Sequence, residues 1–258
     1  MKDNEIKIRN ISFRIALTIV ILMVIVFLLD DVFTLNLYKY GLLPRSLEGL
    51  LGVFTSPFIH NTNDYSHIFN NATPIFVLSW LLFYTYRNIA TRVFVYIYLI
   101  TGVMVWIFGR PSFHIGMSGV IYGLTSFLII SGFIRKDLRS VSLSLLVIFL
   151  YGSLIWGVFP LDPKISWEGH FFGFLSGIIM AIVYRKFPPQ PPKYMYELEE
   201  DIEEDIFPYW LEESNSYLEQ EQNHKNKKQQ VYINYTFIPK YSPQNSNTII
   251  SNSKVEEE

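Results

Sequence analysis

The chain has 258 residues, of which 50% are hydrophobic and 17% charged, against about 25% charged in an average soluble domain. The net charge of −2 excludes a basic nucleic-acid-binding surface, and the absence of cysteine excludes disulfides and thiolate chemistry. Because the residues after position 186 are polar, the hydrophobic residues are concentrated before it, which predicts a membrane domain.

Six apolar segments approach the length of about 20 residues that a helix needs to cross a bilayer. In chain order they cover residues 11–29, 68–86, 91–108, 118–134, 140–158 and 169–184. The first follows basic residues, as in a signal peptide, but Asp30 and Asp31 stand where a cleavage site would need small residues, so we expect a retained span. The sequence predicts an all-α polytopic membrane protein with a six-transmembrane-helix bundle over residues 11–186.

The basic residues of the connecting segments predict the orientation of this bundle. Eleven Lys and Arg residues fall on the side of the N-terminus and four on the other side. Cytoplasmic loops carry the excess of Lys and Arg, so we expect residues 1–10 and the C-terminus to be cytoplasmic. The four residues predicted to lie outside are Lys39, Arg45, Arg110 and Lys164.

Two segments lie outside the predicted spans. The connection over residues 30–66 is half apolar, so we expect a long first loop that lies in the membrane interface, and loops of this length are usually functional. Residues 187–258 contain 14 of the chain's 23 acidic residues and begin with a proline-rich run. Because this composition cannot bury a core, we expect an acidic, mostly disordered cytoplasmic tail.

Polar residues open the three predicted spans that run from outside to inside. His67 and Asn71 lie at the head of the second span, Ser118 at the head of the fourth and His170 at the head of the sixth. Ionisable groups at membrane depth are costly and mark functional sites. His67 and Asn71, four residues apart, also share one helix face. We therefore expect these four residues at a similar shallow depth on one side of the membrane.

Glycines accompany the serine and the histidine. From Gly119 on the fourth span, and from Gly169 on the sixth, glycine recurs every four residues. Such stripes let two membrane helices pack backbone to backbone. If the two stripes face each other, Ser118 and His170 come within reach of one another.

Each feature taken singly has a simpler explanation. A serine at the start of a helix is usually a cap, a histidine on the outer side is often only interfacial, and small-residue stripes are common packing. Because the serine, the histidines and the glycine stripes occur together at one end of three spans, we favour a functional site there. The H-E-x-x-H motif of zinc proteases and the G-x-G-D motif of presenilin-type proteases are both absent from the sequence.

Together these residues resemble the rhomboid family of intramembrane serine proteases, over about residues 30–185. HIFNN at 67–71 is similar to the family's H-x-x-x-N, and GMSGVIYG at 116–123 to its G-x-S-G with a following tyrosine. GHFFGFLSG at 169–177 resembles its last-span H-x-x-G. The six-span topology with both ends in the cytoplasm also matches the bacterial form.

The resemblance implies an intramembrane serine endopeptidase with a Ser–His dyad. Ser118 would be the nucleophile, His170 the general base, Tyr122 the residue that packs on the His170 ring, and His67 and Asn71 oxyanion donors. It implies no cofactor and no metal. The substrates would be transmembrane segments of other membrane proteins, cut near the outer leaflet of the bacterial cell membrane.

Three departures from the family pattern concern the surroundings of this set. Leu51 and Gly52 stand where members often carry Trp-Arg in the first loop, and Met117 replaces a residue that is more often small. The spacing from His60 to His67 is longer than usual, so we assign His60 no role. None of these changes removes a residue of the implied catalytic set.

Two alternative functions remain open. A non-enzymatic metal-binding or transport protein could use His60, His67, His114 and His170 as zinc or copper ligands, although it leaves Ser118 without a role. A rhomboid-like protein could also bind membrane clients without cleaving them, although the intact serine and histidine argue against this. The sequence leaves the substrate and the oligomeric state undefined.

Overall fold

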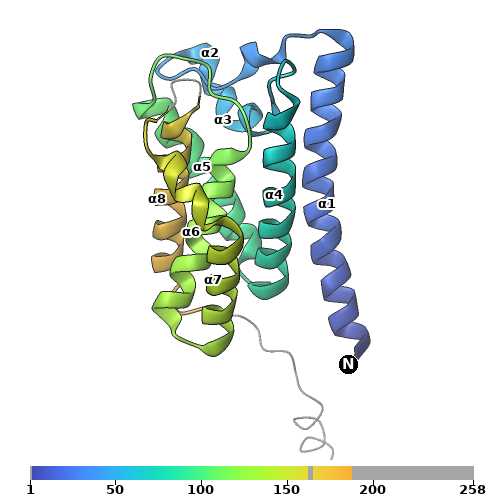
Figure 1. The fold of residues 1–258 in the computed structure, drawn as a ribbon, viewed down its shortest axis with the longest axis vertical. Helices are drawn as coiled ribbons and strands as arrows, with labels where there is room; N and C mark the ends of the chain where they lie inside the picture. Colours follow the sequence, from blue (N-terminus) through green and yellow to red (C-terminus); the bar gives the residue numbers. More distant parts are fainter. Residues whose placement is uncertain (1, 162–164, 188–258) are drawn as a thin grey trace, which may run out of the picture. The chain divides into compact units, whose positions relative to one another are not determined.

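A computed structural model describes residues 2–161 and 165–187, and within them it contains α-helices and short 3-10 helices but no β-strand. The long helices lie side by side, and a layer of short helices lies at one end of the bundle (Figure 1). The predicted all-α membrane fold is confirmed. The predicted tail over 187–258 lies, apart from Phe187, outside the described residues.

Each of the six predicted spans corresponds to a helix. Among the described residues, five apolar helical segments have the 18 or more residues expected of a span, and one further apolar helix, α8, is one residue shorter at 17. These are helices of an integral multi-pass membrane protein. Their bounds are α1 Lys2–Phe33, α4 Tyr65–Thr85, α5 Ala90–Phe108, α6 Ser118–Arg135, α7 Leu138–Tyr151 and α8 Trp167–Val183.

The structure refines two of the expected segments. The predicted fifth span ends as a 3-10 helix, η3 (Gly152–Val158), because glycine and serine after α7 disfavour a continued α-helix. The long first loop contains short helices; its Leu42 and Val53 are buried against the bundle, whereas Leu47 and Phe54 are exposed. The short helices are η1 Leu37–Tyr40, α2 Leu47–Leu50, α3 Gly52–Thr55 and η2 Ser56–Phe58.

Helix α6 is the central element of the bundle. Twelve of its 18 residues are buried, and α4, α5, α7 and α8 all pack on it. Its Leu124 and Phe127 join the main apolar core with Met23 of α1 and Ile97 of α5. By contrast, α7 leaves Phe149 86% exposed, as expected of a helix that faces lipid. The residue that opens α6 is therefore held by the best-packed helix.

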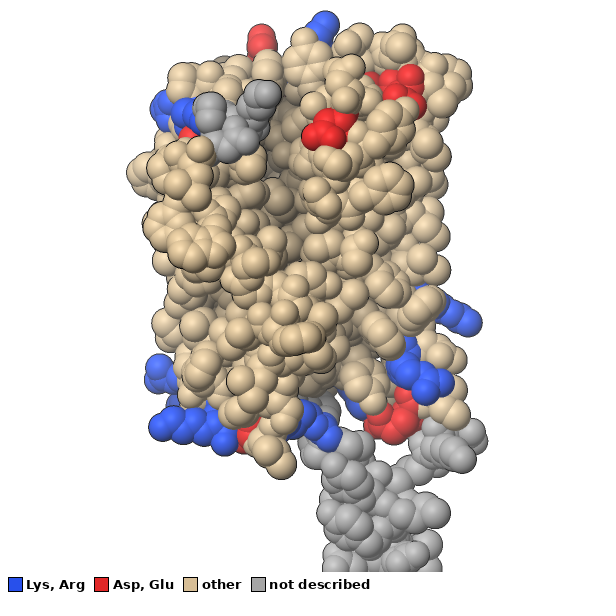
Figure 2. All heavy atoms as spheres, in the orientation of Figure 1, with Lys and Arg blue, Asp and Glu red and all other residues tan. Residues whose placement is uncertain are grey.

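Charged residues gather at the two ends of the bundle. Figure 2 shows a broad band without Lys, Arg, Asp or Glu on the face it displays, with Lys and Arg concentrated at one end. At this end Arg87 forms an ion pair with Glu5 at 2.9 Å. The described chain both begins and ends there (Figure 1).

Candidate active site

Glycines lie at the closest approach of α6 and α8. A Cβ atom at Gly173 would collide with the carbonyl oxygen of Gly119, and one at Gly177 with the carbonyl oxygen of Gly123. Backbone contact of this kind brings two membrane helices closer than larger side chains would allow. The two glycine stripes therefore face each other, which is the condition under which Ser118 and His170 come within reach.

This close contact brings Ser118 next to His170. Ser118 is the first residue of α6, and His170 lies in the first turn of α8. The Oγ atom of Ser118 lies 2.9 Å from Nε2 of His170, within hydrogen-bonding distance. Two residues that are 52 positions apart in the sequence therefore meet at one end of the helix pair.

The His170 ring is held on its other nitrogen and on one face. Nδ1 lies 2.8 Å from the carbonyl oxygen of Gly157, and the Tyr122 ring stacks on the imidazole at 4.1 Å with an interplanar angle of 6°. Because a carbonyl oxygen can only accept, Nδ1 carries the proton in this arrangement. The lone pair of Nε2 then faces the hydroxyl of Ser118 and can accept its proton.

The carbonyl of Gly157 is a site component that sequence analysis does not identify. A Cβ atom at Gly157 would collide with the Tyr122 hydroxyl and lie 3.1 Å from Nδ1 of His170, so a glycine lets the η3 backbone approach the ring. The nearby carboxylate of Glu168 does not take this place, since its Oε1 pairs with Arg110 at 3.4 Å. No residue type in the sequence indicates that a backbone carbonyl takes this role.

Gly116 shapes the loop that leads into α6. Its φ of +103° lies in the region that favours glycine, and its N–H donates to the carbonyl of Ser56 at 2.8 Å. A Cβ atom here would lie 2.7 Å from Nε2 of His67. The first N–H groups of a helix have no partner within it, so the N–H of Ser118 points out of the helix start.

His67 and Asn71 lie one turn apart on α4. The Nδ2 of Asn71 donates to the carbonyl of His67 at 2.7 Å, and the N–H of Asn61 makes a long 3.5 Å hydrogen bond to Nδ1 of His67. Nε2 of His67 is then the protonated nitrogen and faces Gly116. The amide of Asn71 is buried and keeps a second N–H that can donate.

The two remaining outer histidines have different surroundings. His60 is buried, donates from Nδ1 to the carbonyl of Phe58 at 3.2 Å, and burial together with the neighbouring His67 lowers its pKa to about 4. His114 contacts Ser166, and burial lowers its pKa as well. Within residues 2–161 and 165–187, no three His, Asp or Glu side chains are grouped as a metal site requires.

Long side chains fasten the first loop to α5. The Arg45 guanidinium donates to the carbonyls of Ile107 at 3.2 Å and Gly109 at 2.8 Å, and the indole of Trp106 donates to the carbonyl of Ser46 at 3.0 Å. An arginine and a tryptophan thus hold this loop, but at positions other than the adjacent pair expected from the resemblance. The contacts join segments about 60 residues apart, which the sequence pattern does not reveal.

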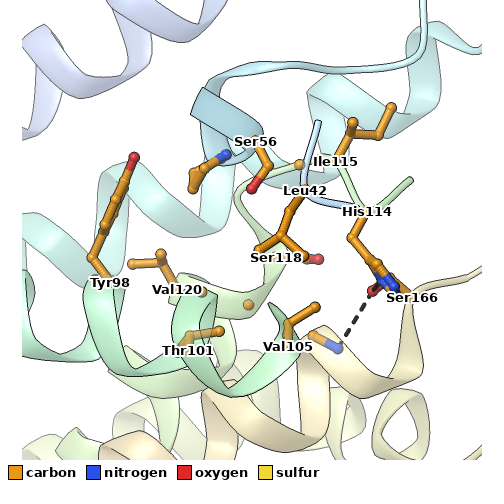
Figure 3. Close-up of a pocket in the computed structure, with 15 residues that line it drawn as sticks. Leu42, Ser56, Tyr98, Thr101, Val105, His114, Ile115, Ser118, Val120 and Ser166 are labelled. Carbon is orange, nitrogen blue, oxygen red and sulfur yellow. Dashed lines mark hydrogen bonds between the residues drawn. The ribbon is translucent and has the colours of Figure 1, made fainter. Parts of the chain in front are cut away.

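A small pocket opens between the first loop and α5, beside the serine. Its lining includes Tyr98 and Thr101 of α5, together with Ser118, His114 and Ser166 (Figure 3). Its volume is about 40 Å³, enough for water or a small side chain. Ser118 therefore borders a small space whose lining mixes apolar residues, such as Leu42 and Val105, with polar ones.

The sequence of this chain is similar to a known protein family and to proteins of mycobacteria. A family model described as Rhomboid domain matches residues 48–187, a range that contains every residue of the candidate site. An uncharacterized protein of Mycobacterium tuberculosis is 32% identical over 177 residues, which cover 64% of this chain and 72% of that protein. An uncharacterized protein of Mycobacterium leprae is 29% identical over 175 residues, covering 64% and 68%.

Proposed function

Because the chain belongs to the Rhomboid family, a family of intramembrane proteases, we propose that it is a serine endopeptidase that cleaves transmembrane segments of other membrane proteins. The observation that carries this proposal is the 2.9 Å contact between Ser118 Oγ and His170 Nε2. The serine is the nucleophile and the histidine the general base of a Ser–His dyad.

In the proposed reaction, Nε2 of His170 takes the proton of the Ser118 hydroxyl as Oγ attacks the scissile carbonyl carbon. The tetrahedral intermediate collapses when the same nitrogen returns the proton to the leaving amine, leaving an acyl-enzyme. Water, deprotonated by His170, then releases the acid product and restores the serine. The Gly157 carbonyl and the Tyr122 ring keep the imidazole in the required tautomer and orientation.

Three donors serve the oxyanion in this proposal. The N–H of Ser118 lies at the start of α6, and Nε2 of His67 lies beside the loop that precedes it. The second N–H of the Asn71 amide is the third donor. Donors that are already fixed in place stabilise developing charge in the transition state, which is often the largest catalytic contribution.

The position of the dyad defines the side from which water and substrate arrive. By the positive-inside rule both termini lie in the cytoplasm of a bacterial cell, which puts Ser118 near the outer leaflet of the cell membrane. A substrate helix must unwind locally there, since an intact helix hides its carbonyl groups. The small pocket beside Ser118 suits a substrate with a small residue before the cut.

The non-catalytic alternatives use the same residues differently. A metal-binding protein needs several histidines free to coordinate, whereas His170 and His114 both have hydrogen-bond partners on both ring nitrogens. A client-binding relative needs neither a free serine hydroxyl nor an oriented base. The Ser118–His170 geometry therefore supports the protease over both.

Cleavage of a model transmembrane substrate by purified protein in detergent tests the proposal. We expect wild type to cleave, Ser118→Ala and His170→Ala to lose cleavage while retaining expression and thermal stability, and EDTA to change nothing. Cleavage near the wild-type rate in either variant would contradict the dyad. Loss of activity with EDTA and recovery with zinc would favour the metal-binding alternative.

A further inference from the structure

One buried carboxylate has no part in the proposed reaction. Glu168 lies in the first turn of α8, two residues before His170, and is only 4% exposed. Two residues are about 200° of helix, so its side chain points away from the histidine. A carboxylate buried at the end of a membrane helix is costly unless a cation and hydrogen bonds compensate it.

The compensating cation comes from the loop between α5 and α6. Nε of the Arg110 side chain lies 3.4 Å from Oε1 of Glu168. The backbone N–H of Arg110 donates to the same oxygen at 3.4 Å. The guanidinium also donates from Nη2 to the carbonyl of Ile165 at 2.7 Å. Arg110 therefore binds both the chain entering α8 and the first turn of that helix.

A second contact lies beside this ion pair. Nδ1 of His114 is 2.6 Å from the hydroxyl of Ser166, and Nε2 of His114 is 3.2 Å from the carbonyl of Arg110. His114 also exchanges two backbone hydrogen bonds with Leu42, at 2.8 and 3.0 Å. The loop that leads to the serine is thus joined to the segment that leads to the histidine at several points.

These contacts lie where the glycine packing ends. Ser118 and His170 both sit in the first turns of their helices, and the contact between their side chains is a single neutral hydrogen bond. The glycine contacts hold the two helices below this level, whereas Arg110 and Glu168 join the segments above it. Ser118 and His170 therefore lie between the glycine contacts on one side and the Arg110–Glu168 ion pair on the other, along the helix axis.

We propose that Arg110 and Glu168 are positioning residues: their ion pair closes a clamp between residues 110–114 and 165–168 that keeps Ser118 Oγ within reach of His170 Nε2. The inference rests on the proposed function. The clamp contributes no atom to the reaction and acts by holding the two helix starts together.

The two partners are unequally exposed, and this makes the inference specific. The Arg110 side chain is 35% exposed and that of Glu168 5%. Removing the arginine side chain leaves a buried carboxylate without its cation, held only by the backbone N–H of residue 110, whereas removing the charge of the glutamate leaves an arginine that water can reach. Arg110→Met should therefore be the more damaging change, and Glu168→Gln should relieve it.

The test compares Arg110→Met, Glu168→Gln and the double variant in detergent. We measure the kcat and KM of substrate cleavage, the rate of fluorophosphonate labelling and Tm, at a temperature where all variants are folded. Arg110→Met should lower kcat and labelling about tenfold, with KM within about twofold of wild type, because the misplaced pair affects only the chemical step. Glu168→Gln should lower kcat about threefold alone, and in the Arg110→Met background it should restore kcat to about that level.

Two further variants keep the outcome decisive. Arg45→Met removes another outer arginine and serves as a control for stability. If it lowers Tm but leaves kcat unchanged, a loss of kcat in Arg110→Met cannot be attributed to lower stability alone. Arg110→Lys keeps the charge but not the forked donor, and should retain the fold with kcat reduced about threefold. Wild-type kcat in a folded Arg110→Met or Arg110→Lys variant, or no recovery in the double variant, would overturn the clamp. Absence of Ser118-dependent cleavage in wild type would instead reject the proposed function.

Discussion

The two flanks of Ser118 are built in opposite ways. On the side that faces α8, glycines such as Gly119 and Gly173 have no side chain, so the two helix backbones are in direct contact. Toward the first loop the chain uses long side chains, with Arg45 and Trp106 reaching across to backbone carbonyls. Two helix backbones in direct contact cannot accept an added side chain unless the helices separate. A contact made by a flexible side chain can be lost while the surrounding side chains adjust. The difference predicts that changes on the α8 flank are severe and those on the loop flank mild.

Gly173→Val should have the largest effect. The added side chain would collide with the carbonyl oxygen of Gly119, so the helices must separate and carry Ser118 away from His170. We expect no detectable cleavage and a lower Tm. The matched control is Gly152→Ala, where the nearest atom to the new Cβ is 3.6 Å away and activity should be retained. An active Gly173→Val variant with wild-type Tm would contradict the tight-packing account.

Asn71→Ala should have an intermediate effect, because it removes one oxyanion donor while the α6–α8 contact stays intact. In a soluble serine protease one such donor is worth roughly 10²–10³ in kcat. Since the Ser118 N–H and His67 share the task here, we expect a loss of about tenfold to a hundredfold, mainly in kcat. Steady-state kinetics measure it, and an effect confined to KM would argue against an oxyanion role.

Arg45→Met should have a smaller effect, on stability. It removes two hydrogen bonds from the guanidinium to the carbonyls of Ile107 and Gly109, and we expect Tm to fall by roughly 3–6 °C with kcat within about twofold of wild type. Thermal unfolding in detergent and the cleavage assay test this together. A complete loss of activity would show that the loop flank is as intolerant as the α8 flank.

Removal of residues 188–258 should have the smallest effect. The Rhomboid match ends at Phe187, and the removed segment is polar and acidic, with a composition that cannot supply a core. We expect the turnover of the truncated protein in detergent to stay within about twofold of wild type. Loss of activity in a truncated protein that still folds would assign the tail a direct part in the enzyme.

The sequence predicted the parts of the molecule that depend on local patterns. Apolar length indicated the spans, the glycine spacing suggested a possible contact between α6 and α8, and the family resemblance implied the pairing of Ser118 with His170. The sequence could not predict the Gly157 carbonyl that orients the imidazole, because a backbone acceptor leaves no residue-type signal. The 3-10 form of η3, on which that carbonyl lies, was likewise hidden within an apolar run.

Contacts between distant segments were also beyond the sequence. Arg110 was visible only as one of four outer basic residues, and no sequence pattern indicated Glu168 as its partner. Their pairing depends on how the loop folds over the start of α8. Arg45 and Trp106 hold the first loop from positions that no spacing rule connects. These are tertiary contacts, fixed by the packing of the whole bundle.

Labelling with a serine-reactive fluorophosphonate tests the central claim most directly, because it reports the nucleophile without requiring a known substrate. Purified wild type, Ser118→Ala and His170→Ala are incubated with the probe in detergent, and the modified residue is identified by mass spectrometry. The account predicts a single phosphonylated residue, Ser118, in wild type and no labelling of either variant. Labelling of another residue, or equal labelling of His170→Ala, would contradict a Ser118–His170 dyad.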